Sequence, residues 1–475
     1  MRLFICSNSG PAPQRDPTEP LRPGASGGLV PHLVALLDIH GGEWFFATNG
    51  PKTTRWPPQA GRVGLHPVTL TQRQHEQHYE TVSVQTLLWL FHYLHETSVG
   101  PTFDAGLHAA WAGYRAVNDG FADRVAGTCA EADGPDVMLV TDYHLLLVPA
   151  ALARRRLPAK TKVVYAHQVP WCEPDYFAIL PAAIRAEILG SLVSCDVVVF
   201  HSSRWLDAFA RCCARYLPGA TVRDTAVEYR DHTTDLTAVP FPLDTAAVLD
   251  IAGAEATERW RQRLHEQARG RRLLVRVDRL DLWKNHPRGL AAFEELLARH
   301  RRLADDVWFL CVLAPTRARS TRHRAYESAC REAAERINES VAAPGRPEPV
   351  TLLYPEDRNE VRHRAVAALS QASTVLINPT YDGFNLVAKE AALVADDAAI
   401  LLSRTAGAYE PLAHAVLPLD PCDVTGTADA LHAALVDGRR PDPAGREAAR
   451  DGVRSDDAGA WLRAALGAGE VPECG

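Results

Sequence analysis

The sequence predicts an α/β protein built on two doubly wound sheets, and three observations predict it. Short apolar runs alternate with amphipathic stretches along almost the whole chain of 475 residues. Most of the apolar runs are rich in β-branched residues and lack a period of two, which is typical of parallel strands covered on both faces. Helical patterns lie between these runs, and such alternation of strands and helices indicates an α/β fold.

The predicted strands are residues 3–6, 137–140, 162–165, 197–201, 273–277, 307–312, 350–354, 375–378 and 400–403. Helical patterns lie between them, for example at residues 289–299, 324–341, 364–371 and 386–395. A domain boundary is expected within residues 239–244, because the two prolines there favour an extended connector over a helix. Two such sheets would face each other across a cleft at their strand ends, where ligands of open α/β sheets bind.

The composition excludes several classes of protein. A net charge of −7 argues against a broad electrostatic interaction with nucleic acid. No apolar run approaches the roughly 20 residues that a membrane span needs, and the first run is too short for a signal peptide. The ten cysteines form no CxxC pair, so reduced thiols are expected. We therefore expect a cytoplasmic protein with no nucleic-acid or membrane partner; a homo-oligomer stays open.

The strongest local signal is RVDRLDLWKN, residues 276–285. It extends a predicted strand, so that Arg279 and Lys284 emerge from the strand end into a loop. Two cations there can converge on a diphosphate, bind it in the ground state and neutralise charge as it leaves. Lys284 is one of only five lysines in the chain. The alternative is a surface Arg/Lys pair bridged to Asp278 or Asp281.

A second signal is NPTYDGFNLVAKEAAL, residues 378–393, in which a strand end, a turn and a helix start follow one another. Gly383 allows the backbone to approach a ligand closely, and the amides of residues 384–387 would form an anion site at the helix N-terminus. Asp382 points from the turn toward the ligand, and Glu390 can accept hydrogen bonds from a ribose. The alternative is an ordinary turn with Asn385 as the N-cap.

The N-terminal half offers weaker signals. Residues 140–149 and 163–177 place Asp142, His144 and His167 at strand ends, where an Asp and a His can bind sugar hydroxyls or the reacting centre. A lone His of this kind, His144 above all, is more often structural. Gly28 belongs to an SGGL turn that can admit a phosphate, although turns use glycine pairs widely. We find neither HExxH nor a strand-end DxD, so no metal is expected.

Together the motifs resemble the trehalose-6-phosphate synthase family of retaining glycosyltransferases, which includes pseudoglycosyltransferases of antibiotic pathways. The segments that carry the resemblance are 7–8, 26–29, 41–45, 79–93, 141–149, 166–170, 200–213, 276–285, 335–338, 381–390, 404–412 and 455–462.

The resemblance implies a GT-B type fold, with two Rossmann-like domains facing across a cleft. Residues 1–240 would bind the acceptor, residues 241–450 would bind the nucleotide sugar, and residues 451–475 would return to the first domain as a helix. It implies neither a metal nor a cofactor beyond the donor substrate. The acceptor would attack on the face that the nucleotide leaves, and the departing phosphate would take its proton.

The resemblance also assigns residues to the donor and the acceptor. The implied donor-binding residues are Gly28, Arg279, Lys284, Asp382, Gly383, Asn385, Leu386, Val387 and Glu390. The implied catalytic residues are Asp142, His167, Arg279, Lys284 and Asp382. The implied acceptor-binding residues are Ser9, Tyr79, Asp142 and Arg336. Removal of Lys284 is expected to abolish most activity and to leave the fold intact.

The departures from the family pattern lie in the acceptor half. Ser9 stands where the family usually has an Arg that binds the phosphate of glucose 6-phosphate. We therefore expect transfer to another small polar acceptor, such as a sugar, cyclitol or nucleoside phosphate, in specialised metabolism. The alternatives are a pseudoglycosyltransferase that joins a nucleotide-activated cyclitol to an aminocyclitol phosphate, a trehalose-6-phosphate synthase, and a catalytically silent sugar-phosphate sensor. The donor base (UDP, GDP or ADP), the transferred ring, the acceptor and the oligomeric state stay open.

Overall fold

The computed structural model describes residues 1–13, 21–23, 28–48, 56–131, 134–155, 157–314, 320–355 and 358–467. The chain forms two compact units, Met1–Pro242 together with Asp457–Gly475, and Leu243–Asp456. The chain passes from the first unit to the second after residue 242, where the expected boundary was 240. It returns to the first unit after residue 456, where the expected boundary was 450. None of the helices in the described ranges is long and apolar enough to cross a membrane.

The first unit is an α/β/α layer structure around a ten-stranded sheet in the order β3-β4-β2-β1-β5-β6-β7-β10-β9-β8. Its strands are β1 (Leu3–Ser7), β2 (Gly42–Thr48), β3 (Gln59–Ala60), β4 (Val63–Thr69), β5 (Val137–Thr141), β6 (Lys162–Ala166), β7 (Val197–Phe200), β8 (Thr221–Arg223), β9 (Ala226–Tyr229) and β10 (His232–Ala238). In this order, neighbouring strands of the block β4-β2-β1-β5-β6-β7-β10 pair in parallel. The strands β3, β9 and β8 at the two edges pair antiparallel with their neighbours.

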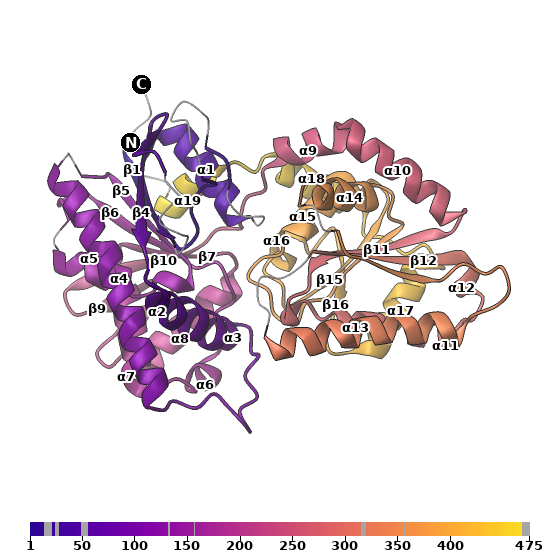
Figure 1. The fold of residues 1–475 in the computed structure, drawn as a ribbon, viewed down its shortest axis with the longest axis horizontal. Coiled ribbons are helices and arrows are strands. Elements are labelled where there is room, and N and C mark those ends of the chain that lie inside the picture. The colour runs from indigo at the N-terminus through magenta and orange to yellow at the C-terminus, as the bar shows by residue number, and fades with distance from the viewer. Residues whose placement is uncertain are drawn as a thin grey trace. The chain divides into compact units, whose positions relative to one another are not determined.

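Helices cover both faces of this first sheet (Figure 1). They are α1 (Leu29–His40), α2 (Gln72–His75), the π-helix η1 (Glu76–Leu88), α3 (Trp89–Phe91), α4 (Ala105–Glu131), η2 (Tyr143–Leu145), α5 (Val148–Arg155), α6 (Pro174–Phe177), α7 (Ala182–Leu192), α8 (Ser203–Tyr216) and α19 (Ala458–Leu466). The helix α19 comes from the C-terminal segment and packs beside α1, where Trp461 and Leu462 join the same core as Leu33 and Leu37.

The second unit is built on a six-stranded parallel sheet in the order β13-β12-β11-β14-β15-β16. Its strands are β11 (Arg272–Arg279), β12 (Val307–Ala314), β13 (Val350–Leu353), β14 (Thr374–Ile377), β15 (Ala399–Ser403) and β16 (Leu417–Leu419). Its helices are α9 (Thr245–Gly253), α10 (Glu255–Ala268), η3 (Leu282–Lys284), α11 (His286–Arg299), α12 (Leu303–Asp306), α13 (Thr321–Ser340), α14 (Arg358–Ser370), α15 (Leu386–Val394), α16 (Tyr409–Leu412), α17 (Val424–Leu435) and α18 (Pro443–Arg454).

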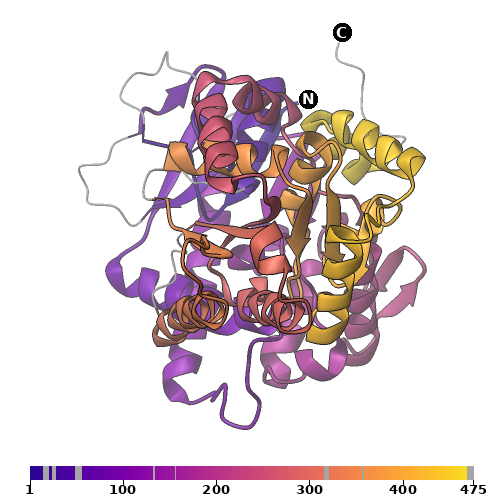
Figure 2. The same ribbon diagram turned by 90° about the vertical axis from the view of Figure 1, so that its right-hand side faces the viewer.

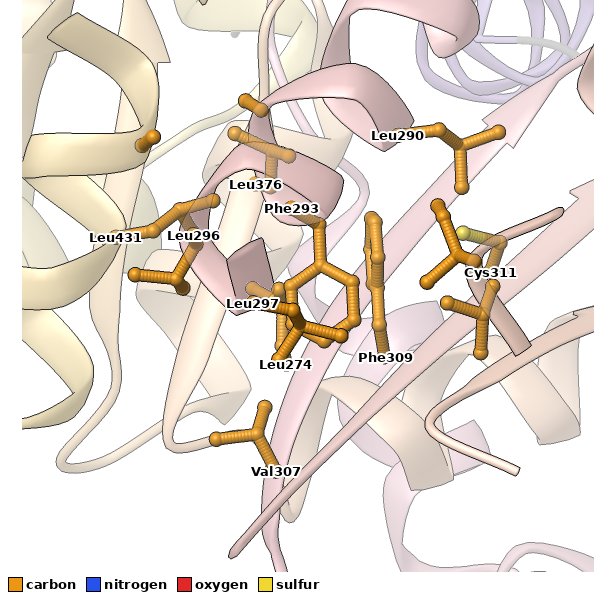
Figure 3. Close-up of a cluster of buried hydrophobic side chains, with 14 of the residues drawn as sticks. Leu274, Leu290, Phe293, Leu296, Leu297, Val307, Phe309, Cys311, Leu376 and Leu431 are labelled. Carbon is orange, nitrogen blue, oxygen red and sulfur yellow. The ribbon is translucent and has the colours of Figure 1, made fainter. Parts of the chain in front are cut away.

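The second sheet is buried on both faces. Helices α11, α13 and α17 lie side by side on one face, and α10 and α14 lie on the other (Figures 1 and 2). Beneath α11, Phe293 packs edge-on against Phe309 of β12 with ring centroids 5.2 Å apart, among leucines of both elements (Figure 3). Apolar burial of this kind, worth ~1.5–3 kcal/mol per large side chain, fixes the strand ends that carry the site.

All the predicted strands and helices are confirmed; most ends shift by three residues or fewer, whereas α14 begins six residues before the predicted start at 364. The strands β2, β4 and β10 are the longer strands that the apolar pattern missed. In β4 the run is interrupted by His66 and Pro67, and in β10 polar residues dominate, so neither shows a continuous apolar signal. Pairing with buried neighbours in the sheet makes these segments strands.

Candidate active site

The two clusters of candidate residues lie at equivalent places in the two sheets. In the second sheet, β11 is followed in the chain by β12 on one side, whereas β14 pairs on its other side. In the first sheet, β1 is followed by β2 on one side, and β5 pairs on the other. The order of strands thus reverses between β11 and β14 and between β1 and β5, and such switch points are where open α/β sheets bind ligands at the carboxyl ends of their strands.

Lys284 connects the two strand ends at the switch point of the second sheet. Its side chain is 9% exposed, and its Nζ lies 2.7 Å from Asp278 Oδ1, at the end of β11, and 2.8 Å from Asp382 Oδ2, in the turn after β14. Burial alone would lower the pKa of Lys284, but the two carboxylates more than offset this and raise it. Burial raises the pKa of Asp278, and Lys284 opposes that rise. Lys284 is therefore a permanent cation at this junction.

The turn after β14 leads into helix α15, whose N-cap is Asn385. Asn385 has a positive φ of 83°, its side chain accepts a hydrogen bond from Ala388 N at 3.2 Å, and its Nδ2 donates to Asp382 Oδ2 at 3.0 Å. The interpretation of Asn385 as the N-cap is thus confirmed. Because the cap uses the amide of Ala388, the amides of Leu386 and Val387 are the ones that an anion at this helix N-terminus would meet.

A close backbone contact fixes the position of the same turn. A Cβ added to Gly407 would lie 2.1 Å from the carbonyl oxygen of Gly383, so only glycine fits. Gly407 N donates to Asp382 O at 3.0 Å, and Ala408 N donates to Phe384 O at 2.7 Å. The segment after β15 therefore determines where Asp382 and Gly383 lie.

Glu390 lies one helical turn further along α15. Its side chain is 12% exposed, and Arg362 of α14 approaches its Oε1 at 3.3 Å. Burial raises the pKa of Glu390, and Arg362 acts in the opposite direction. A carboxylate at this depth, next to the helix start, can accept hydrogen bonds from hydroxyls of a ligand at the helix N-terminus.

Arg279 differs from Lys284 in its exposure. Its side chain is 51% exposed, its guanidinium pairs with the buried Asp281 at 2.8 Å, and its carbonyl oxygen lies 2.9 Å from His286 Nε2. The alternative of an Arg/Lys pair bridged to Asp278 and Asp281 is therefore correct about the ion pairs. It is wrong about Lys284, which is buried and reaches a third carboxylate across the sheet.

Two supporting residues of this junction were missed by the sequence analysis. Arg276 is buried within β11, and its guanidinium donates to Asn378 Oδ1 and to Lys284 O. Asn285 Nδ2 donates to Asn378 O at 2.8 Å and to Pro421 O at 2.7 Å. An Arg inside an otherwise apolar strand was the available signal, because a buried guanidinium needs partners.

In the first sheet, Asp142 lies at the end of β5 with a positive φ of 74°. Its Oδ1 accepts a hydrogen bond from Tyr143 N at 2.9 Å, and its Oδ2 lies 3.4 Å from His144 Nδ1. The His144 ring stacks on Tyr79 of η1, with centroids 5.7 Å apart and an interplanar angle of 9°. His144 thus links two of the predicted acceptor-binding residues.

The turn after β1 joins this cluster. Ser7 Oγ donates to Ser9 O at 2.7 Å, and Asn8 Oδ1 lies 3.3 Å from His78 Nε2, next to Tyr79 on η1. Ser9, Tyr79 and Asp142 are thereby brought to the same edge of the sheet.

His167 and Gly28 have largely structural surroundings. His167 is buried, its ring nitrogens lie 3.0 Å from Tyr165 Oη and 3.3 Å from Pro170 O, and burial lowers its pKa to about 3, so its ring is neutral. Gly28 is the N-cap of α1, and its carbonyl oxygen accepts a hydrogen bond from His32 N at 3.2 Å. The preceding residues 26–27 of the SGGL turn lie outside the described residues.

Within the second unit, Arg336 lies apart from the cluster around Lys284. It lies on α13, where its guanidinium forms a bidentate pair with Glu294 of α11 at 2.8 and 2.9 Å. Tyr326, whose Oη accepts a hydrogen bond from His286 N beside the β11 loop, is ten residues earlier on this helix. At 1.5 Å per residue that separation is about 15 Å. Arg336 thus bridges two helices of the second unit, and its part in acceptor binding stays a prediction.

A cavity of about 600 Å³ lies beside the C-terminal half of α13 and β13, and none of the predicted residues lines it. Within the described ranges no group of three or more His, Cys, Asp or Glu side chains could bind a metal ion.

Two Rossmann-like units, each with polar residues at its switch point, define a protein of the GT-B type. Residues 47–468 match the family described as Glycosyltransferase family 20, and the chain belongs to this family.

Three known proteins illustrate the relationship. A validamine 7-phosphate valienyltransferase of Streptomyces hygroscopicus subsp. jinggangensis is 28% identical over 98% of this chain and 92% of its own length. A trehalose-6-phosphate synthase of Mycobacterium marinum is 31% identical over 93% of this chain and 88% of its own length. The crystal structure of a UDP-forming α,α-trehalose-phosphate synthase from Burkholderia xenovorans, in complex with glucose 6-phosphate, has a TM-score of 0.82 and 25% identity, with 98% of this chain and 100% of that chain covered. The family resemblance seen in the motifs is confirmed.

Proposed function

We propose that this protein transfers a glycosyl group, with retention, from a nucleotide sugar to a small phosphorylated acceptor in specialised metabolism. The single observation that carries this is the junction of Lys284, Asp382 and the N-terminus of α15 at the switch point of the second sheet. It combines a buried cation, a carboxylate that the cation fixes, and the first amides of a helix, which have no partner within the helix itself. That combination suits a diphosphate with a sugar attached to it.

Each residue of the junction has a distinct part in the proposed chemistry. The Lys284 ammonium carries three N–H groups, of which two are directed at Asp278 and Asp382, and the third is assigned to the diphosphate. Arg279 and the amides of α15 add positive potential where charge develops on the departing phosphate. The carboxylate of Asp382, fixed by Lys284, accepts hydrogen bonds from hydroxyls of the transferred ring.

The acceptor is assigned to the first unit, at Ser9, Tyr79 and Asp142. Ser9 lacks the cation that the family resemblance puts at this place for glucose 6-phosphate, which disfavours ordinary trehalose-6-phosphate synthesis. A pseudoglycosyltransferase is the second candidate, because a valienyltransferase relative matches 98% of this chain. The buried Lys284–Asp382 pair and Glu390 are retained together, which disfavours a silent sensor.

Thermal unfolding with UDP-, GDP- and ADP-glucose tests the donor assignment. A ligand at 100 times its Kd stabilises the folded state by about 2.7 kcal/mol, which corresponds to roughly 5–11 °C for a unit of this size. We expect such a shift with one of these nucleotides in the wild type. No shift with any of them would contradict the assignment and favour a silent protein.

A matched pair of variants locates the effect. Arg279→Ala and Arg336→Ala each remove a guanidinium that is about half exposed, 51% and 56%, and paired with a carboxylate. We expect Arg279→Ala to lose most of the nucleotide-dependent shift and Arg336→Ala to retain it. Equal shifts in the two variants would place the nucleotide elsewhere.

A further inference from the structure

Lys389 is a buried cation to which the proposed chemistry gives no part. It lies on α15 next to Glu390, its side chain is 4% exposed, and its Nζ is 2.6 Å from Asp456 Oδ2. The same Nζ lies 4.9 Å from the centroid of the Phe384 ring. Burial lowers the pKa of Lys389, and Asp456 opposes this. Because a buried ammonium needs compensating partners, these two contacts must be accounted for together.

Asp456 is the last residue of the second unit. The chain enters this unit at Leu243 and leaves it after Asp456. Asp456 Oδ2, the oxygen that pairs with Lys389, also accepts a hydrogen bond from Leu243 N at 2.9 Å. One carboxylate oxygen therefore connects both crossing segments to a single side chain of α15.

Phe384, whose ring the Lys389 ammonium contacts, belongs to the turn between β14 and α15 (residues 378–385), named the donor turn here. Its ring is buried, and it directly follows Asp382 and Gly383 and precedes the cap Asn385. A displacement of the turn therefore moves the surface on which the Lys389 ammonium rests. The ammonium also bonds to Asp456, whose carboxylate accepts a hydrogen bond from Leu243 N. A displacement of the turn therefore reaches both crossing segments through the Phe384–Lys389 and Lys389–Asp456 contacts.

We propose that Lys389 is a positioning residue that couples the donor turn to the two chain crossings, so that a nucleoside diphosphate bound at the turn orders Leu243 and Asp456. The nature of the ligand rests on the proposed function, whereas the coupling itself rests on the contacts of Lys389. Any change that passes along the chain between the units must go through these two segments, and Lys389 is where both meet the site.

Hydrogen exchange of the full-length protein, followed by mass spectrometry, measures this coupling at the Leu243 amide. The two test variants are Lys389→Met, which removes the cation, and Asp456→Asn, which keeps an oxygen acceptor for Leu243 N but removes the ion pair. Lys160→Met is the matched control, because Lys160 is 58% exposed and pairs with Asp136 in the first unit.

With UDP, GDP or ADP bound, exchange at Leu243 is expected to slow at least threefold in the wild type and in the control. In both test variants the nucleotide should still bind, but exchange at Leu243 should change less than 1.5-fold. A residue with a purely structural part would leave the nucleotide-linked change intact. The coupling is overturned if the variants keep that change, or if a bound nucleotide leaves Leu243 unchanged in the wild type.

A second comparison needs no nucleotide and separates the coupling from the proposed function. If none of the three nucleotides binds, the proposed function fails, and Phe384→Leu then decides about Lys389. We expect exchange at Leu243 to quicken at least threefold in Phe384→Leu, while peptides of β12 stay unchanged, and to quicken no further when Lys389→Met is added. Unchanged exchange at Leu243 in Phe384→Leu, or fully additive effects, would overturn the coupling.

Discussion

The substitution Lys284→Met tests the junction at the switch point through stability alone. It keeps the approximate volume of the side chain but leaves Asp278 and Asp382, which are 6% and 8% exposed, without their shared cation. Removing one partner of a buried ion pair costs about 3–5 kcal/mol. The structure therefore predicts a large loss of stability, which the sequence-based expectation of an intact fold on removal of Lys284 did not include.

Urea unfolding at pH 7.5 measures the loss, with Lys160→Met as the exposed control. The control should stay within about 0.5 kcal/mol of the wild type. Adding Asp278→Asn to Lys284→Met removes one of the two carboxylates that have lost this cation and should restore roughly 2 kcal/mol. If Lys284→Met unfolds at the same urea concentration as the control, the buried cation does not compensate these carboxylates and the reasoning is refuted.

The same variant has a defined dependence on pH. Burial raises the pKa of Asp278 above its ordinary 3.8, and Lys284 limits that rise, so the pKa rises further in Lys284→Met. A carboxyl group with a higher pKa in the folded state contributes stability that is lost as pH rises through the folded pKa. The deficit of Lys284→Met should therefore shrink as the pH falls from 7.5 toward 5. A deficit that is constant over this range would contradict the assignment.

Three further predictions address other parts of the site. Gly407→Ala puts a methyl group 2.1 Å from the Gly383 carbonyl oxygen; it should cost about 1–3 kcal/mol in urea unfolding, and unchanged stability would show that the turn can move freely. Glu390→Gln should gain stability relative to the wild type as pH rises above 4.5, because burial raises the pKa of Glu390 and its ionisation then costs stability; a difference independent of pH would contradict this. Ser9→Arg should bind glucose 6-phosphate at least tenfold more tightly by calorimetry, as a charge-assisted hydrogen bond worth about 1.5–3 kcal/mol allows; no gain would refute our account of the acceptor change.

Much of the fold follows from local patterns, and the exceptions have local causes. The strand β11 was recognisable because it is an apolar run followed by charged residues, and its burial on both faces is observed. The strand β4 was not, because His66 and Pro67 break its apolar run, and pairing with β2 and β3 makes it a strand. The local composition of a segment indicates whether it is buried. Its pairing with a neighbouring strand depends on the whole sheet and cannot be seen in the segment itself.

The site was predictable in its parts but not in its connections. Spacing placed Lys284 at a strand end and Asp382 in a turn, but nothing local shows that residues 98 positions apart form an ion pair. Arg336 illustrates the same limit, because the motif that assigns it to the acceptor does not show that its guanidinium pairs with Glu294 on a neighbouring helix. Motifs identify residue types that suit a chemistry, and only the packing of the sheet shows which of them meet.

The most direct test of the central claim is amide hydrogen exchange of the wild-type protein with a nucleoside diphosphate that calorimetry shows to bind. Our account predicts that protection concentrates in residues 383–388, because this segment contains the amides of Leu386 and Val387, with which α15 begins. Binding that leaves this segment unchanged and protects a different part of the second unit would contradict it.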